Sequence, residues 1–349
     1  MGFYFCLLLI ICMGSYLFGF IAGKNKRIVQ TVWCAIVLLW VAANRGCEVG
    51  ADTQTYILAY QNIASATWEN ILSRNALADF EIGYVVMCKL CSYISASESF
   101  FLFWTSLFSI LPVSYFIYKY SKSPTMSFVL YVLTTHYILV LGVIRQSIAM
   151  GIVLLALDII IEKKKKWILK ALILIVLATL SHTSAILGIV FFVPTFFEKV
   201  DAKHYGGALI TILFMMLFGP KLVDLILSYD PNYYVHVSSG FDGVGRLVIP
   251  ICILTAFILF YKKKLYTLDE NGKWWEYMML VALILQVFSY FFVIATREAM
   301  IFNFSYLLLI PNSLSGLNKG NRFVWNIIVV SLYVVFFAIC FDERYVYIR

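Results

Sequence analysis

Long apolar runs, separated by short polar or basic connectors, fill most of the chain. A helix needs about 20 mostly apolar residues to cross the hydrocarbon core of a membrane. Six runs approach that length and predict one crossing each: Phe3–Ala22, Ile28–Ala43, Phe100–Tyr118, Gly206–Leu227, Leu247–Tyr261 and Phe323–Phe341. Because only helices and closed barrels satisfy the backbone in lipid, these runs predict an all-α polytopic membrane protein.

Three further apolar blocks are too long for one crossing, and each carries a cationic or titratable residue near its middle. They are Thr125–Ile161 around Arg145, Trp167–Phe197 around His182, and Trp274–Leu317 around Arg297. A polar residue costs least at the membrane interface, so each block is expected to fold back at that residue. Together with the six single runs, the three blocks predict about 12 transmembrane helices in one integral-membrane domain, residues 1–349.

Basic residues fall in every second connector, which the positive-inside rule places in the cytoplasm, with both chain ends outside. The rule keeps the lysine run Lys163–Lys166 inside only if the moderately apolar stretch Ile82–Ala96, which contains Lys89, does not cross. We therefore expect residues 44–99 to form one external segment with a short interfacial or re-entrant helix. Residues 228–245 are expected to form a second external loop.

Composition supports lipid as the main solvent of the chain. Hydrophobic residues make up 62% and charged residues 13%, against about 45–50% and 25% in soluble domains. These values exclude a soluble enzyme, a secreted disulfide scaffold and a disordered protein. The net charge of +8 does not indicate nucleic acid, because the lysines lie in the connectors. Most of the eight cysteines lie in apolar runs, and the Cys88/Cys91 pair has no second pair to complete a zinc site.

Arginine and lysine are distributed differently between the two predicted faces. The cytoplasmic connectors hold 16 Lys and 2 Arg, whereas the external face holds 2 Lys and 7 Arg: Arg45, Arg74, Arg145, Arg246, Arg297, Arg344 and Arg349. The planar guanidinium binds phosphate or carboxylate through two hydrogen bonds, so this bias predicts anion recognition outside. The alternative is that individual arginines form structural ion pairs with acidic residues of the same face.

The sequence contains no Walker loop, G-x-G-x-x-G, H-E-x-x-H, G-x-S-x-G or D-x-D motif. An external active site would not meet ATP or nucleotide sugars. A substrate there must carry its own activation, such as a lipid pyrophosphate.

Four short elements, in order along residues 40–200, resemble the EpsG family of Wzy-type polysaccharide polymerases. Residues 45–56 (RGCEVGADTQTY) are similar to the family's R-x(3,4)-G-x-D-x(3)-Y element. The others are Glu81–Tyr84 (family E-P-G-F/Y), Arg145-Gln146-x-x-Ala149, and Ser181–Ala185 (family F-H-x-S-A). Ile82 and Ser181 stand where the family usually has proline and phenylalanine.

This resemblance implies a multi-pass enzyme of the bacterial cytoplasmic (inner) membrane, similar to the C-type glycosyltransferase superfamily, with its active face external or periplasmic. Such an enzyme transfers a growing glycan from undecaprenyl pyrophosphate to the terminal sugar of another lipid-linked repeat. Its partners are the lipid-linked oligosaccharide, membrane lipid, a chain-length regulator and a flippase, with no nucleic acid. No metal and no cofactor are expected.

The residues fit that reaction, which must stabilise a departing pyrophosphate and deprotonate an acceptor hydroxyl. Candidates for pyrophosphate binding are the arginines Arg145, Arg45, Arg246 and Arg297. Imidazole titrates near neutral pH, which makes His182 the candidate base, with the carboxylates Glu81 and Asp52 as rivals. Candidates for acceptor sugar binding are Tyr56, Tyr84 and Gln146. The alternative for external aromatic residues is a membrane-interface belt.

Two other functions remain open at this point. A ligase of the O-antigen type would use the same donor with a different acceptor. A flippase or transporter of lipid-linked oligosaccharide is the alternative from another class. Transporters often place charges at the bilayer midplane and contain internal repeats. Here the charges gather at the ends of the predicted spans, which favours an enzyme.

Overall fold

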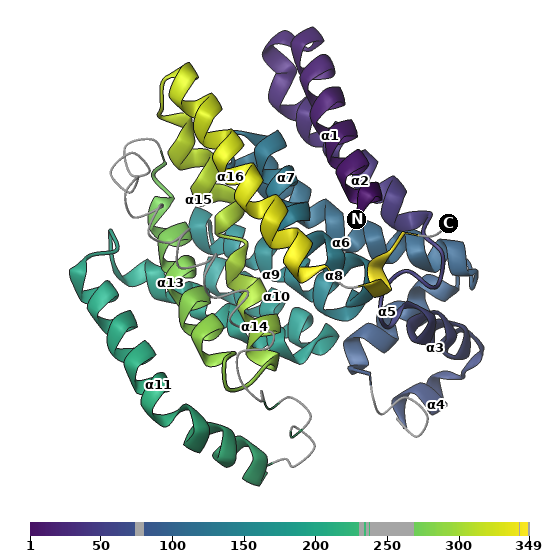
Figure 1. Ribbon diagram of the computed structural model, residues 1–349. Helices are drawn as coiled ribbons and strands as arrows, with labels where there is room; N and C mark the ends of the chain where they lie inside the picture. The colour runs from purple at the N-terminus through teal and green to yellow at the C-terminus, as the bar shows by residue number, and fades with distance from the viewer. Residues whose placement is uncertain (74–79, 230–233, 235–236, 238–268, 342, 348–349) are drawn as a thin grey trace. The chain divides into compact units, whose positions relative to one another are not determined.

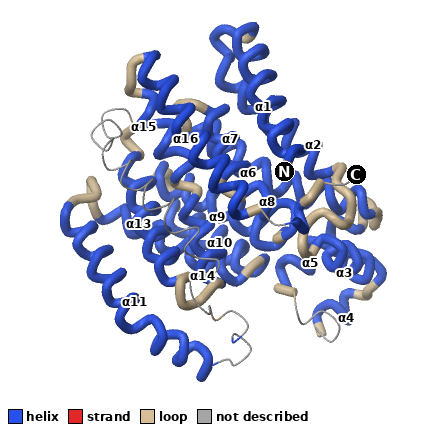
Figure 2. Tube along the Cα trace, in the orientation of Figure 1, coloured by secondary structure: helices blue, strands red, loops and turns tan. Residues whose placement is uncertain are grey.

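The computed structural model describes residues 1–349 except 74–79, 230–233, 235–236, 238–268, 342 and 348–349. Helices joined by loops make up the described chain, and Figure 2 draws no strand in it. The chain divides into two compact units, one made of Met1–Ile189 with Phe341–Arg349 and the other of Val190–Cys340.

The first unit is a stack of helices in which α1 packs on α2, α2 on α6, α6 on α9, and α9 on α10 (Figure 1). Its elements are α1 (Gly2–Ile21), η1 (Gly23–Asn25), α2 (Lys26–Ala43), α3 (Thr53–Ser65), α4 (Trp68–Leu72), α5 (Ile82–Ser92), α6 (Glu98–Tyr120), α7 (Pro124–Leu133), α8 (His136–Gly142), α9 (Ile144–Glu162), α10 (Trp167–Ser181) and η4 (Glu343–Tyr345). The 3₁₀ helix η2 (Thr183–Phe196) follows α10 and leads into the second unit.

The second unit is built around α13, which packs against α11, α14 and α15. Its helices are α11 (Ala202–Tyr229), α13 (Gly272–Phe288), α14 (Ile294–Asn303), α15 (Tyr306–Ser315) and α16 (Lys319–Cys340). The buried carboxylate of Asp269 accepts hydrogen bonds from Trp275 Nε1 at 2.9 Å and Asn312 Nδ2 at 2.5 Å. These bonds tie the start of α13 to α15.

Among the described residues, six helices are long and apolar enough to cross a membrane, namely α1, α2 with η1, α6, α9, α11 and α16. The pair α7 and α8, bent by 58°, makes a seventh when it is counted as one span. The protein is therefore a multi-pass membrane protein. The predicted count of 12 gives a full crossing to each half of the three long blocks, and the described residues do not show it. The run Leu247–Tyr261 lies outside the described residues.

Two of the three expected interruptions occur where the polar residue stands. The helix break between α8 and α9 falls at Val143, two residues before Arg145, and His182 separates α10 from η2. The third expectation was wrong, because Arg297 lies inside α14 and the preceding break falls at residues 289–293. A helix tolerates arginine where its long side chain reaches out of the apolar layer, so the charge alone does not fix a break.

Residues 44–99 contain the three short helices α3, α4 and α5. The 11 residues of α5 extend about 16 Å, which is too short for a ~30 Å hydrocarbon core. Lys89 is buried and donates to the carbonyl oxygens of Ala64 at 2.9 Å and Ala66 at 2.8 Å, at the end of α3. The side chain of Lys89, on α5, therefore caps the C-terminal end of α3. The external position of residues 44–99 stays a prediction. Most of the expected loop 228–245 lies outside the described residues.

Residues 341 and 343–347 pack against the amino-terminal helices of the first unit. Tyr4 Oη donates to the carbonyl of Tyr345 at 2.8 Å, and the Gly50 N–H donates to the carbonyl of Arg344 at 2.8 Å. The ring of Tyr345 lies against Gly142, where an added Cβ would come within 2.6 Å of its hydroxyl. Gly50 has a φ of 102°, a conformation that L side chains rarely adopt. These residues thus contact both the loop before α3 and the end of α8.

Candidate functional site

Three residues from distant parts of the chain meet around one carboxylate. Glu81 Oε2 pairs with Arg145 Nη1, and Glu81 Oε1 lies 3.1 Å from His182 Nδ1. The backbone N–H of Thr183 also donates to Glu81 Oε1 at 3.3 Å. Each side chain of this Glu81 cluster (Glu81, Arg145 and His182) keeps 15–23% of its surface exposed. The cluster is therefore reachable from outside the protein.

The position of Glu81 follows from a close approach between two helices. Glu81 is the N-cap of α5, and two residues later Gly83 lies against the end of α10. An added Cβ on Gly83 would be 2.6 Å from the carbonyl oxygen of Leu180, inside normal contact. Only glycine permits α5 to come this near to α10, whose end carries His182. The glycine of the Glu81–Tyr84 element therefore brings Glu81 within reach of His182.

Arg145 is the second residue of α9 and lies over an aromatic floor, which we define as Phe80, Tyr56 and Tyr84. Its Nε donates to Tyr56 Oη at 3.2 Å, and its Cζ is 4.8 Å from the centroid of the Phe80 ring. The three rings pack on one another with centroids 5.9–6.0 Å apart. The guanidinium is thus oriented from one side by the rings and from another by Glu81.

The electrostatics of the cluster keep the Glu81 carboxylate ionised. Burial by itself raises the pKa of Glu81, but the hydrogen bond with His182 and the charge of Arg145 lower that pKa to about 2. A carboxylate with such a pKa is a weak proton acceptor at neutral pH. It holds its two partners in place.

His182 ends α10 in an extended backbone conformation, with φ −161° and ψ 125°. The backbone N–H of His182 donates to the carbonyl of Ala178 at 2.9 Å, so the last turn of α10 holds the backbone of His182 in place. With Nδ1 directed at a carboxylate, the neutral ring carries its proton on Nδ1 and its lone pair on Nε2. That arrangement prepares Nε2 to accept a proton.

The remaining predicted catalytic and sugar-binding residues lie close to the cluster in sequence or space. Asp52 is exposed at the N-cap of α3, one turn before Tyr56. Tyr56, Tyr84 and Gln146 are buried, with 5%, 0% and 0% of their surface exposed. Tyr56 contacts Arg145 through its hydroxyl, and the binding of an acceptor sugar by these three residues stays a prediction.

Of the four predicted pyrophosphate-binding arginines, the structure describes Arg145, Arg45 and Arg297. Arg45 is 3% exposed, and its Nη1 donates to the carbonyl of Ala42 at 2.5 Å and to Ser106 Oγ at 3.3 Å. Burial lowers the pKa of Arg45 to about 10. The binding of pyrophosphate by Arg45 stays a prediction. Arg297 is exposed on α14 of the second unit, and Arg246 lies outside the described residues.

Phe80 and Thr183 belong to the site, although sequence reasoning assigned them no role. No pattern marks Phe80, whereas Thr183 directly follows His182 within the 181–185 element. Among the described residues, no group of three or more His, Cys, Asp or Glu side chains is arranged to hold a metal ion. The Glu81 cluster therefore presents an oriented guanidinium, from Arg145, beside an oriented imidazole, from His182.

Comparison with known proteins gives one match. A model of the EpsG family matches residues 28–347, which is nearly the whole chain. We found no significant match among curated proteins or among solved structures.

Proposed function

This chain belongs to the EpsG family, a group implicated in exopolysaccharide biosynthesis, and from that premise we propose that it is a Wzy-type repeat-unit polymerase. In the proposed reaction, the bond between the anomeric carbon of the growing glycan and its pyrophosphate oxygen breaks. A bond to a hydroxyl oxygen of the acceptor sugar forms. The hydroxyl proton passes to a base, and undecaprenyl pyrophosphate leaves. The location would be the outer face of the bacterial cytoplasmic membrane.

The observation that carries this proposal is the shared carboxylate, Glu81, between Arg145 and His182. Glycosyl transfer from a pyrophosphate needs a cation near the leaving group and a base near the acceptor hydroxyl. A single carboxylate that orients both groups sets the distance between them. Such preorganisation is the main contribution that a protein makes to a reaction whose donor is already activated.

Arg145 is assigned to the pyrophosphate of the donor. A guanidinium binds a phosphate through two charge-assisted hydrogen bonds, and these strengthen as the leaving group gains charge. The contact of Arg145 with the face of the Phe80 ring keeps the plane of the guanidinium fixed. Arg246 and Arg297 are retained as further candidates for the same ligand.

His182 is assigned as the general base through Nε2, and Glu81 as the residue that positions it. The pKa of about 2 argues against Glu81 as the base, because a group so acidic rarely accepts a proton at neutral pH. Asp52 is the second candidate base, since it is exposed one turn from Tyr56.

The glycan of a deletion strain tests the proposal. Loss of polymer, with one-repeat glycan still made and displayed outside, would support a polymerase. Accumulation of unflipped lipid-linked repeats inside the cell would contradict it and indicate a flippase. Full-length polymer that stays on its lipid and is not passed to its final acceptor would contradict it and indicate a ligase. Complementation with wild-type protein and with Glu81→Gln links the result to the Glu81 cluster, because only the wild-type protein should restore polymer synthesis.

A further inference from the structure

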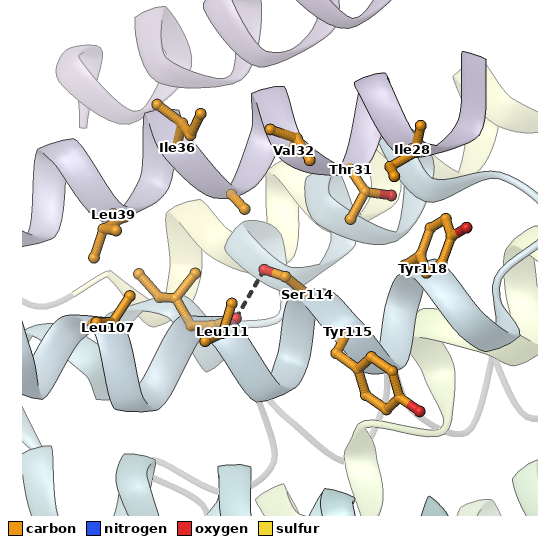
Figure 3. Close-up of a pocket in the computed structure, with 12 residues that line it drawn as sticks. Ile28, Thr31, Val32, Ile36, Leu39, Leu107, Leu111, Ser114, Tyr115 and Tyr118 are labelled. Atoms are coloured by element: carbon orange, nitrogen blue, oxygen red, sulfur yellow. Dashed lines mark hydrogen bonds between the residues drawn. The ribbon is translucent and has the colours of Figure 1, made fainter. Parts of the chain in front are cut away.

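An apolar groove runs between α2 and α6, both of which are long and apolar enough to cross a membrane. Its volume is about 330 Å³, and Figure 3 shows the side chains of the two helices facing one another across it. Thr31 and Ser114, on its wall, donate their hydroxyls to the carbonyls of Arg27 and Ile110 in their own helices. The hydroxyls are thus satisfied, and the groove suits a hydrocarbon chain.

The groove is about as long as one membrane leaflet is thick. On α2 it extends from Ile28 to Leu39, which is about 16 Å at the ~1.5 Å rise of an α-helix. The hydrocarbon core of a bilayer is ~30 Å thick, so each leaflet contributes about half of that. One phospholipid acyl chain therefore matches the length of the groove.

One end of the groove carries an exposed cation. Arg27 precedes Ile28, and its Cζ lies 5.6 Å from the centroid of the Tyr118 ring, which lines the groove. In the part of the chain that the structure describes, no carboxylate forms an ion pair with Arg27. Lys119, beside Tyr118, is paired with Asp158 at 2.6 Å. The guanidinium of Arg27 is thus a cation at this end that remains available to an anionic ligand, and it is the one in contact with a residue that lines the groove.

The opposite end of the groove is apolar. Leu39 and Leu107 line it there, and Ser106, next to Leu107, accepts from the buried Arg45. The Arg27 end is also far from the Glu81 cluster. Arg145 begins α9, whereas Glu162, at the other end of that helix, pairs with Lys119. Their separation along α9 is about 26 Å.

We propose that the groove between α2 and α6 binds an anionic phospholipid, with one acyl chain along the groove and the phosphate at Arg27. The length of the groove, its apolar wall and the unpaired cation at one end each match a part of that lipid. The polyprenyl chain of a donor bound at Arg145 would have its phosphates at the other end of the unit. The site is independent of the reaction proposed above.

Native mass spectrometry of the full-length, delipidated protein tests this site. The protein is titrated with phosphatidylglycerol or with phosphatidylcholine of the same acyl chains. We expect phosphatidylglycerol to bind more tightly, by about fivefold, because it lacks the positive choline group that offsets the phosphate charge in phosphatidylcholine. Arg27→Gln should remove this preference. Lys24→Gln removes the same charge from the neighbouring 3₁₀ helix η1, outside the groove, and should leave the preference intact.

Filling the groove gives a second measurement. Ala35→Leu should weaken the binding of both phospholipids, whereas Val176→Leu, on an exposed position of α10, should not. Equal binding of the two lipids by the wild-type protein would overturn the proposal, as would an Arg27→Gln variant that keeps the preference. Binding of undecaprenyl phosphate that Ala35→Leu blocks and Arg27→Gln leaves unchanged would also overturn it, because the occupant would then be the polyprenyl chain. If Ala35→Leu disturbs folding, the comparison of Arg27→Gln with Lys24→Gln still decides.

Discussion

Glu81 Oε1 and His182 Nδ1 lie 3.1 Å apart, although the two residues are separated by 101 positions in the chain. The carboxylate fixes which ring nitrogen of His182 carries the proton, so Nε2 is left as the acceptor. The same carboxylate pairs with Arg145. Glu81 therefore has two functions, which substitutions of His182 and of Arg145 separate.

His182→Ala and His182→Gln should both reduce chain growth by about 10²- to 10⁴-fold, the usual contribution of a general base. Glutamine can hydrogen-bond but cannot take a proton at neutral pH. The measurement is polymer length and turnover of the strain's own lipid-linked repeat in membranes with equal protein. His204→Gln is the matched control, because that histidine pairs with Asp201 in the second unit. Substantial activity in His182→Gln would move the role of base to Asp52.

Arg145→Ala should lower turnover by about 10²- to 10³-fold, the range seen when a group that stabilises transition-state charge is removed. Arg145→Lys should retain part of the activity, since it keeps the charge but loses the fork. Turnover and apparent donor affinity are measured together with membrane abundance. Polymer of wild-type length from Arg145→Ala would make the residue a structural partner of Glu81 alone.

Gly83→Ala should reduce turnover on the order of 10- to 100-fold, because the new methyl group pushes α5 away from Leu180 and separates Glu81 from His182. Gly206→Ala is the control, since that glycine has nothing within 4 Å of an added Cβ. Equal turnover in the two variants would show that the close approach of α5 to α10 does not set the geometry of the site.

The purified protein should become less stable in acid, because Glu81 becomes protonated and its ion pair is lost. Its pKa is lowered from 4.5 to about 2, so the carboxylate stabilises the fold fully above about pH 4.5, and this contribution is lost as pH falls toward 2. We expect the difference in melting temperature between wild type and Glu81→Gln to be constant from about pH 5 to 7. It should shrink below about pH 4.5. A difference that stays constant down to pH 3 would be inconsistent with the ion pair.

Topology is tested by labelling with a membrane-impermeant maleimide in a background without the native cysteines. Gln61→Cys, exposed on α3, should react in intact cells. Lys165→Cys should react only after the membrane is opened, because lysine runs resist translocation. The reverse pattern would place the Glu81 cluster on the cytoplasmic side.

The sequence predicted the interruptions next to Arg145 and at His182, because a charged or titratable residue inside an apolar block must leave the hydrocarbon. The same reasoning was wrong at Arg297, since α14 carries this residue without a break and the chain turns earlier, at residues 289–293. The count of 12 spans stays a prediction, because the described residues give six or seven candidate helices. Local pattern cannot show whether half of a long block reaches across the membrane.

The elements of the site were visible in the sequence, but their contacts were not. The motif resemblance drew attention to Glu81, Arg145 and His182 separately, yet their pairing depends on the approach of α5 to α10 at Gly83. The burial of Arg45 likewise depends on packing against Ser106, which lies 61 positions later. Such long-range contacts leave no periodic signal in the chain.

The contact of Tyr345 with Tyr4 spans 341 positions and sets an order of events during synthesis. At about 5–20 residues per second, the ribosome makes Tyr345 roughly 17–70 s after Tyr4. During that time the first helices are already in the membrane, while the backbone N–H of Gly50 still lacks the acceptor that Arg344 provides. The first unit is therefore completed only by residues made after the second unit, and a nascent chain stalled before Phe341 should expose the loop before α3 to quality-control proteases.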